Sequence, residues 1–282
     1  MTDPIIVMGM HRSGTTLVSK ILSRCGVFMG NKVNNEREAL FFVKLNDWIL
    51  NQLGGRWDCP PEMDYLYTDR EIYKSTLEYL DQCISGPGFV KYLGVKNYVL
   101  RSKKGFGSKK LWGWKDPRNV YTLPVWLDVF PNSKVIYIER NGVDVAHSLK
   151  TRSLITKKRN SDRFKENSLM YTLGLKKIEF SSSIKCCNLE EGYALWEKYI
   201  KESKKNISRL KKTKVLTLKY ENLVLHPKSE LKRIINFTGG SAGEEVKKNL
   251  VDDMNKERAY AYKNNPELVF FAAEVDNRLA NE

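Results

Sequence analysis

The chain has 282 residues, of which 41% are hydrophobic and 29% charged, a composition typical of a soluble globular protein with one large domain. No apolar run approaches the ~20 residues of a membrane span, and the polar residues after Met8 do not resemble a signal peptide, so we expect a cytoplasmic protein. The formal net charge of +15 is compatible with an anionic ligand but does not identify one, because many lysines lie in runs typical of solvated surfaces.

The first stretch, residues 4–18, predicts a strand, a turn and a helix. A β-branched run ends at Gly9, and apolar residues recur at helical spacing from about Gly14 onward. Such a turn gathers backbone N–H groups at the positive end of a helix dipole, a geometry that binds phosphate or sulfate. Four residues separate Gly9 from Gly14 as in a P-loop, but Thr15 stands where a nucleotide triphosphatase has Lys. Thr15 and Thr16 can donate to phosphate oxygens, and Arg12 supplies the cation.

Further elements follow in alternation. Helical spacing predicts helices over 38–53, 69–84 and, less clearly, 89–100, and then over 120–130, from 143, over 189–210 and beyond 227. Strands are predicted at 110–115, 134–140 and 214–219. The basic, weakly periodic stretch 153–188 interrupts this order and predicts a lid or binding loop, with a short helix around 169–180.

This alternation predicts an α/β fold of three layers, similar to P-loop proteins, with a central parallel sheet of about five strands flanked by helices. We expect a single domain over residues 1–282 with a variable insertion around 153–188. Ligands bind at the carboxyl ends of parallel strands. Segments 9–16, 115–118, 140–142 and 220–222 all follow strands and therefore form one candidate site.

A second motif runs from Arg140 to Leu149. Arg140 ends a strand and Ser148 lies on the helix that follows, so both side chains suit a second phosphate. The alternative is that Arg140 pairs with Asp144 and only caps the turn. Five cysteines without a C-x-x-C pair, and the separated histidines His11, His147 and His226, predict reduced thiols and no structural metal.

These motifs resemble a known family. His11 to Thr16, which includes Ser13 and Gly14, resembles the 5′-phosphosulfate loop of sulfotransferases, and Arg140 to Leu149 resembles their 3′-phosphate motif. Segments 114–118 and 220–223 look like further parts of the bacterial and carbohydrate- or tyrosyl-protein-type branches, so the resemblance covers 5–237. It implies PAPS as sulfuryl donor, PAP as product and no metal, with Arg140 and Ser148 on the 3′-phosphate.

The resemblance also implies a general base. The catalytic His of the cytosolic branch has no counterpart here, and members similar to this chain use a Glu. The triplet 45–47 (Leu-Asn-Asp) places Glu38 in register with that base, and Glu36 is the second candidate. Either carboxylate could instead only favour the dipole of the following helix. Lys115 could add a cation near the sulfuryl group, or it could pair with Asp116 or another carboxylate.

The sequence therefore predicts sulfuryl transfer from PAPS to a hydroxyl of a carbohydrate, lipid or small molecule, with Glu38, Arg12 and Lys115 as catalytic residues. Segments 153–188 and 57–67 are predicted to shape the acceptor pocket, and no nucleic-acid partner is expected. The alternatives are a P-loop nucleotide kinase or triphosphatase, and a non-catalytic protein that binds a nucleotide or polyanion. Thr15 in place of the P-loop Lys argues against the kinase.

Overall fold

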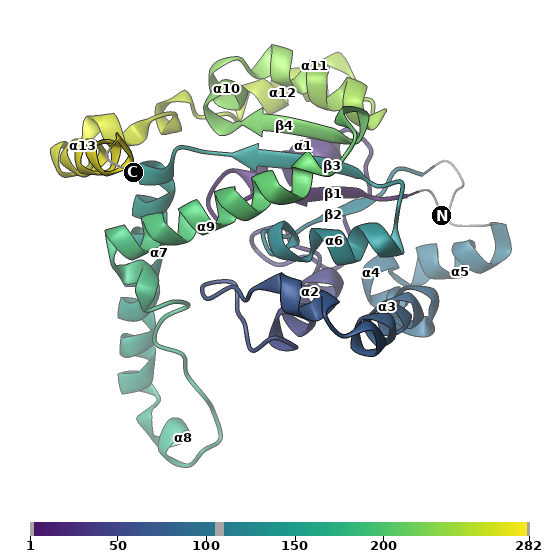
Figure 1. Cartoon of the computed structure of the whole chain (residues 1–282), viewed down its shortest axis with the longest axis horizontal. Coiled ribbons are helices and arrows are strands. Elements are labelled where there is room, and N and C mark those ends of the chain that lie inside the picture. Colours follow the sequence, from purple (N-terminus) through teal and green to yellow (C-terminus); the bar gives the residue numbers. More distant parts are fainter. Residues whose placement is uncertain (1–2, 105–109, 281–282) are drawn as a thin grey trace. The chain divides into compact units, whose positions relative to one another are not determined.

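The computed structural model describes residues 3–104 and 110–280. At its centre lies a parallel sheet whose strands have the spatial order β2-β1-β3-β4 (Figure 1). The strands are β1 (Ile5–Met8), β2 (Gly113–Lys115), β3 (Lys134–Glu139) and β4 (Val215–Lys219). The α/β class is confirmed, but the described residues contain four strands, slightly fewer than the five predicted, because the chain beyond β4 continues only as helices and turns.

The contacts divide the chain into two compact units. The first comprises Met1–Arg140 and Tyr199–Ala259, and the second comprises Asn141–Lys198 and Tyr260–Glu282. The expectation of a single domain with an insertion at 153–188 stays a prediction.

One face of the sheet in the first unit is covered by helices α1 (Thr15–Arg24), α10 (Tyr220–Leu225), α11 (Pro227–Thr238) and α12 (Glu244–Asp252). Alternate strand residues point to this face, as the two-residue period of a strand requires. They form one buried cluster with apolar residues of the helices; its members include Ile5, Val7, Val18, Ile21, Leu22, Ile136, Ile138, Leu216, Leu218, Leu223, Leu231, Ile234 and Leu250.

The opposite face carries the other strand residues and a cluster of aromatic rings. Trp114 of β2 stacks on Phe42 of α2 (Leu40–Asn51), with 3.9 Å between ring centroids, and both rings contact Trp126 of α6 (Asn119–Val129). Helices α3 (Arg70–Ser85), α4 (Val90–Leu93) and α5 (Val95–Lys104) complete this side of the chain. The predicted helix over 89–100 is divided into α4 and α5 by Gly94, whose φ is 75°.

The second unit contains α7 (Gly142–Glu166), α8 (Ser168–Thr172), the first half of α9 (Leu189–Ser208) and α13 (Pro266–Ala280). A small cluster of Val143, Ala146, Tyr193, Leu268, Phe271 and Val275 packs α7, α9 and α13 together. The expectation of an irregular stretch from residue 153 is wrong for its first part, because α7 continues to Glu166. Its exposed second half is rich in Lys and Arg, which favour helix without needing an apolar face.

Short 3-10 turns join these elements at Met63–Tyr67, Pro87–Phe89, Lys185–Cys187, Lys212–Lys214, Lys256–Arg258 and Ala261–Asn264. Within the described part of the chain, every helix is too short or too polar to cross a lipid bilayer.

The aromatic cluster generates a stability prediction. Replacing Phe42 by Ala removes a fully buried ring, and the cavity and lost burial should lower the free energy of unfolding by about 3–5 kcal/mol. Urea unfolding followed by near-ultraviolet circular dichroism measures this loss. The control is Tyr65→Ala, since that side chain is 65% exposed and its removal should change the free energy by less than about 0.5 kcal/mol. Similar losses in both variants would contradict the assignment of Phe42 to the core.

Candidate active site

The loop between β1 and α1 requires glycine at both ends. Gly9 and Gly14 have φ values of 147° and 99°, which side chains rarely adopt. A Cβ on Gly9 would lie 2.3 Å from the carbonyl oxygen of Ile138, and one on Gly14 would lie 2.4 Å from the Tyr220 ring. The loop is therefore packed closely between β3 and the start of α10.

This loop leads directly into the N-terminus of α1. The Ser13 hydroxyl donates to the carbonyl of Met10 at 2.6 Å, so this side chain closes the turn. Helix α1 begins after Gly14, which has no side chain to cap the first N–H groups. Thr15 is buried and Thr16 is half-buried beside it. The predicted anion site at residues 9–16, which we call the cradle, thus has backbone N–H groups, a helix dipole and a threonine hydroxyl.

Two arginines frame the loop. Arg12 lies in the left-handed region, with a φ of 69°, and its carbonyl accepts a bond from Nη1 of Arg140 at 3.3 Å. Arg140 is 9% exposed, and its Nη2 donates to the carbonyl of Arg258 at 2.9 Å. Its guanidinium lies 4.5 Å from the centroid of the Tyr220 ring. The structure thus brings Arg140 to the loop and holds its orientation from three sides.

Ser148, the second residue predicted for this phosphate, lies on α7 in the second unit and is half-buried. The side chain of Asn141 caps α7 by accepting from the N–H groups of Val143 and Asp144. Asp144 in turn accepts from the N–H of Tyr262 at 2.8 Å. The joint action of Arg140 and Ser148 on one phosphate stays a prediction, because each belongs to a different unit.

The segment with the two candidate bases is bonded to the start of α1. The Thr16 hydroxyl donates to the carbonyl of Glu36 at 3.1 Å. The Glu36 carboxylate also lies 3.4 Å from this hydroxyl and 3.5 Å from Nη1 of Arg12, and its side chain is 45% exposed. Glu36 therefore shares its partners with the cradle.

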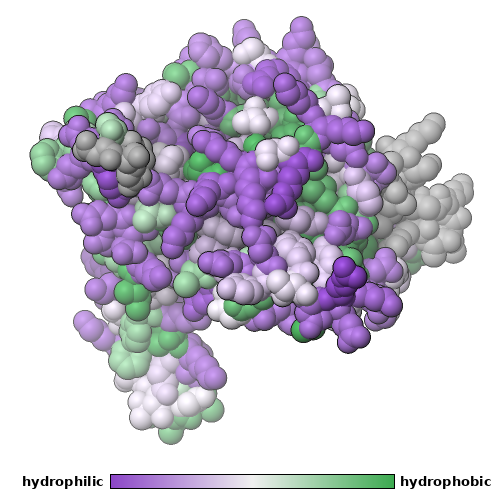
Figure 2. All heavy atoms as spheres, viewed as in Figure 1, coloured by the Kyte–Doolittle hydropathy of each residue, from purple (hydrophilic) through white to green (hydrophobic). Residues whose placement is uncertain are grey.

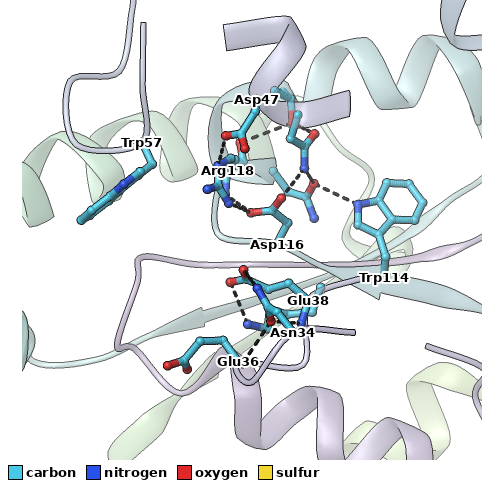
Figure 3. A network of polar contacts seen from close by, with 12 residues as sticks. Asn34, Glu36, Glu38, Asp47, Trp57, Trp114, Asp116 and Arg118 are labelled. Carbon is cyan, nitrogen blue, oxygen red and sulfur yellow. Dashed lines mark hydrogen bonds and ion pairs between the residues drawn. The ribbon is translucent and has the colours of Figure 1, made fainter. Parts of the chain in front are cut away.

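Glu38 has a different environment. Its side chain is 7% exposed, and its Oε1 pairs with Nζ of Lys115 at 3.1 Å, while Oε2 accepts from Asn34 at 2.8 Å. Lys115 is almost fully buried, so the two charges neutralise each other away from water. In Figure 3 the Glu36 carboxylate points away from the contacts that Glu38 makes with its neighbours. The structure thus joins two predicted catalytic residues, and Lys115 pairs with Glu38, a carboxylate other than Asp116.

A buried polar network holds the residues that follow Lys115. The amide of Asn46 on α2 donates to Asp116 and to Asn119, both at 2.9 Å, and its oxygen accepts from Thr122 and Trp126. Asn119 in turn donates to the carbonyl of Val7 on β1 at 3.0 Å. The loop after β2 is thereby tied to α2 and to β1. In the sequence, the triplet 45–47 only places Glu38 in register with the base of the family. It gives no sign that Asn46 forms this network.

Arg118 completes the network from the solvent side. Its backbone N–H and its Nη1 both lie 3.0 Å from Oδ1 of Asp116, and its guanidinium also pairs with Asp47 (Figure 3). Burial raises the pKa of the Asp116 carboxyl above its usual range, and the neighbouring Arg118 guanidinium opposes that rise. Removal of Arg118 would therefore leave a buried carboxyl without its compensating charge.

Aromatic residues border the loop near His11. The His11 ring is buried, with 4.5 Å between its centroid and that of Trp57 and 6.1 Å to that of Tyr199. The Tyr199 hydroxyl donates to the carbonyl of Trp57 at 2.8 Å. One end of the segment 57–67, predicted to shape the acceptor pocket, thus contacts the cradle loop. The rest of that prediction stays open.

The described residues contain neither a cluster of metal-binding side chains nor a disulfide bond. No group of three or more His, Cys, Asp or Glu side chains in this part of the chain could hold a metal ion. The five cysteines form no disulfide bond with one another.

Comparison with known proteins gives the family. Residues 4–242 match a model described as the sulfotransferase family. A solved sulfotransferase domain from the curacin biosynthetic pathway is 14% identical, with 98% of each chain covered and a TM-score of 0.53. At this identity the likeness shows a shared fold.

Two further solved structures have lower scores. A sulfotransferase from Alicyclobacillus acidocaldarius is 15% identical, with 89% of this chain and 90% of that chain covered and a TM-score of 0.45. Mouse sulfotransferase SULT7A1, solved in complex with PAP, is 15% identical, with 90% and 65% covered and a TM-score of 0.38. No curated protein matches the chain.

The Asn46 network generates a second prediction. Asn46→Ala removes four buried hydrogen bonds, leaves the indole of Trp126 without its hydrogen-bond partner and Asp116, Asn119 and Thr122 with one bond fewer, and should lower the free energy of unfolding by about 3 kcal/mol. The matched control is Asn51→Ala on the same helix, where the side chain is exposed and the expected change is under about 0.5 kcal/mol. Chemical denaturation compares the two, and equal stability of both variants would show that the network does not hold the loop.

Proposed function

The chain belongs to the sulfotransferase family, and from this premise we propose that it transfers a sulfuryl group from PAPS to an acceptor hydroxyl and releases PAP. The bond between sulfur and the phosphate oxygen breaks, a bond between sulfur and the acceptor oxygen forms, and the hydroxyl proton passes to a carboxylate. One observation carries this proposal. Thr16, at the start of α1, holds the segment with Glu36 and Glu38 against the predicted phosphosulfate cradle.

The cradle supplies the groups for the donor's 5′ end. The N–H groups at the start of α1, including those of Gly14 and Thr15, can donate to its oxygens. The Thr16 hydroxyl has one proton, which bonds to the Glu36 carbonyl, and it would exchange this bond for one to the donor. Arg12 adds a positive charge beside them. Such donors stabilise the negative charge that develops on the leaving phosphate oxygen. Ser13 contributes by closing the loop, because its hydroxyl bonds to Met10.

Arg140 is proposed to bind the 3′-phosphate, together with Ser148. Its guanidinium is oriented by the Tyr220 ring and two backbone carbonyls, so little side-chain freedom remains to be lost on binding. A 3′-phosphate distinguishes PAPS and PAP from ATP and ADP. This contact therefore supplies the selectivity for the donor.

Glu38 is the better candidate for the base. The Glu36 carboxylate shares Arg12 and Thr16 with the proposed donor site, so an anionic donor would repel it and compete for the same partners. The partners of Glu38 are Asn34 and Lys115, and each of its oxygens has a second lone pair that can accept from an acceptor hydroxyl. Lys115 would remain beside the base and stabilise negative charge near the sulfuryl group.

The acceptor remains a hydroxyl of a carbohydrate, a lipid or a small molecule. Trp57, which packs against His11 of the cradle loop, is proposed as part of its binding surface. A mass-spectrometric assay of PAPS turnover against a panel of glycans, lipids, peptidyl tyrosine and small alcohols identifies the class.

The role of the base is tested by a matched pair of variants. Glu38→Gln removes the proton acceptor and keeps the shape, so kcat should fall by about 10²–10⁴-fold while PAP binding persists. Glu36→Gln should retain most of the turnover. The measurement is PAPS consumption with an acceptor found in the panel, with melting temperatures to confirm folding. The reverse order of effects would assign the base to Glu36, and PAP binding without any turnover in the unmodified protein would favour a non-catalytic binder.

Donor selectivity is tested by thermal denaturation. At a hundred times its dissociation constant, PAP should stabilise the native state by about 2.7 kcal/mol, and ADP at the same concentration should stabilise it much less. Arg140→Ala should abolish the difference, because the 3′-phosphate loses its cation. Equal stabilisation by ATP with Mg²⁺ would support the kinase or triphosphatase alternative instead.

A further inference from the structure

Exposed apolar side chains are concentrated in one segment of the second unit. The described residues include nineteen exposed large hydrophobic side chains, and eight of them lie within residues 154–184, which we call the hairpin. These eight are Leu154, Ile155, Phe164, Leu169, Leu173, Leu175, Phe180 and Ile184. Single exposed apolar residues need no explanation, but such a concentration indicates a surface that binds something.

Three leucines form the tip of the hairpin. Leu169, Leu173 and Leu175 are 67%, 61% and 66% exposed, and they lie on α8 and on the turn that ends it. Gly174, with a φ of 70°, terminates α8, and the N–H of Leu175 donates back to the carbonyl of Met170 at 3.0 Å. This closure keeps the three side chains close together.

The hairpin is internally packed, so the exposure of its leucines does not result from a lack of structure. The Phe164 ring lies 5.6 Å from the Tyr171 ring and 5.5 Å from the Phe180 ring, measured between centroids. The Asn160 amide donates to the carbonyl of Glu179 at 2.6 Å and ties the returning chain to α7. The segment packs its aromatic rings against one another and leaves the aliphatic tip in water.

The hairpin is also basic. Residues 154–184 contain seven Lys or Arg and three Asp or Glu, a formal charge of +4. Arg163 and Lys165 precede the tip and Lys176 and Lys177 follow it, and all four are exposed. Figure 2 shows green and white spheres, apolar or weakly polar, gathered with purple ones at its lower left, where Figure 1 draws α8 and the far end of α7.

From this combination we propose that the hairpin docks on an anionic membrane surface. The three leucines enter the boundary between headgroups and acyl chains, and the flanking basic side chains contact the anionic headgroups. This is peripheral attachment, which needs no helix that spans the bilayer. A second copy of the chain fits less well, because a two-fold interface would place two surfaces of charge +4 against each other. The proposal does not rest on the proposed reaction.

Vesicle co-sedimentation of the full chain tests the apolar tip. The unmodified protein should bind vesicles of equal parts phosphatidylcholine and phosphatidylglycerol, and bind pure phosphatidylcholine vesicles far less. Leu169→Ser, Leu173→Ser and Leu175→Ser together should lower the ratio of bound to free protein on the order of tenfold or more. The matched control replaces Ile72, Val95 and Leu225, which are also exposed apolar residues, by Ser and should bind as the unmodified protein does.

A second triple variant tests the charges. Lys165→Gln, Lys176→Gln and Lys177→Gln together should lower binding to the anionic vesicles on the order of tenfold or more and weaken its dependence on salt. The control neutralises Lys204, Lys211 and Lys212, which are exposed outside the hairpin, and should retain most of the binding. Melting temperatures close to that of the unmodified protein confirm that the variants are folded.

Three results would overturn the proposal. The first is unchanged vesicle binding by both hairpin variants. The second is a dimer in light scattering that the leucine variant converts to a monomer, since the tip would then bind another copy. The third is a loss of turnover on a water-soluble acceptor without any loss of vesicle binding, which would assign the hairpin to a lid over the substrate.

Discussion

The arrangement of the candidate site depends on the amide of Asn46. Its four hydrogen bonds connect α2 with the loop after β2 and with α6, and through Asn119 they reach the carbonyl of Val7. A buried amide with all its bonds made permits one arrangement of these elements, because any other leaves polar groups without partners. Glu38 precedes α2 and Lys115 ends β2, so the network also sets the distance between the proposed base and its cation.

Charged side chains surround the residues that the Asn46 network holds. Two carboxylates and two cations lie beside the start of α1, and the cradle groups Arg12 and Thr16 contact Glu36. An anion that binds at the cradle would compete with Glu36 for Arg12 and Thr16, whereas Glu38 would keep its own partners. Under the proposed function, the two neighbouring carboxylates would differ in role, because one shares partners with the donor and the other does not.

The hairpin and the cradle use positive charge differently. Beside the cradle, Arg140 is buried and held by an aromatic ring and two carbonyls, which suits a fixed phosphate. Around the tip of the hairpin, the lysines are exposed, which suits a surface where many headgroups are equivalent. Under the two proposals, the net charge of +15 includes a fixed phosphate site and a membrane-binding surface as well as solvated lysine runs.

By itself the sequence determined the parallel α/β fold, the strand–turn–helix unit with its glycines, and the membership of the family, because these follow from local patterns. It placed Lys115 and Arg140 at one edge of the sheet, and the family resemblance put Glu38 in register with a base. Only the tertiary structure decided that Glu38 pairs with Lys115, 77 residues away, and that Tyr220 and Arg258 orient Arg140. Local spacing cannot encode such contacts, since they depend on how distant elements pack. The sequence did not predict the length of α7 either, because apolar residues do not recur at helical spacing in its exposed half.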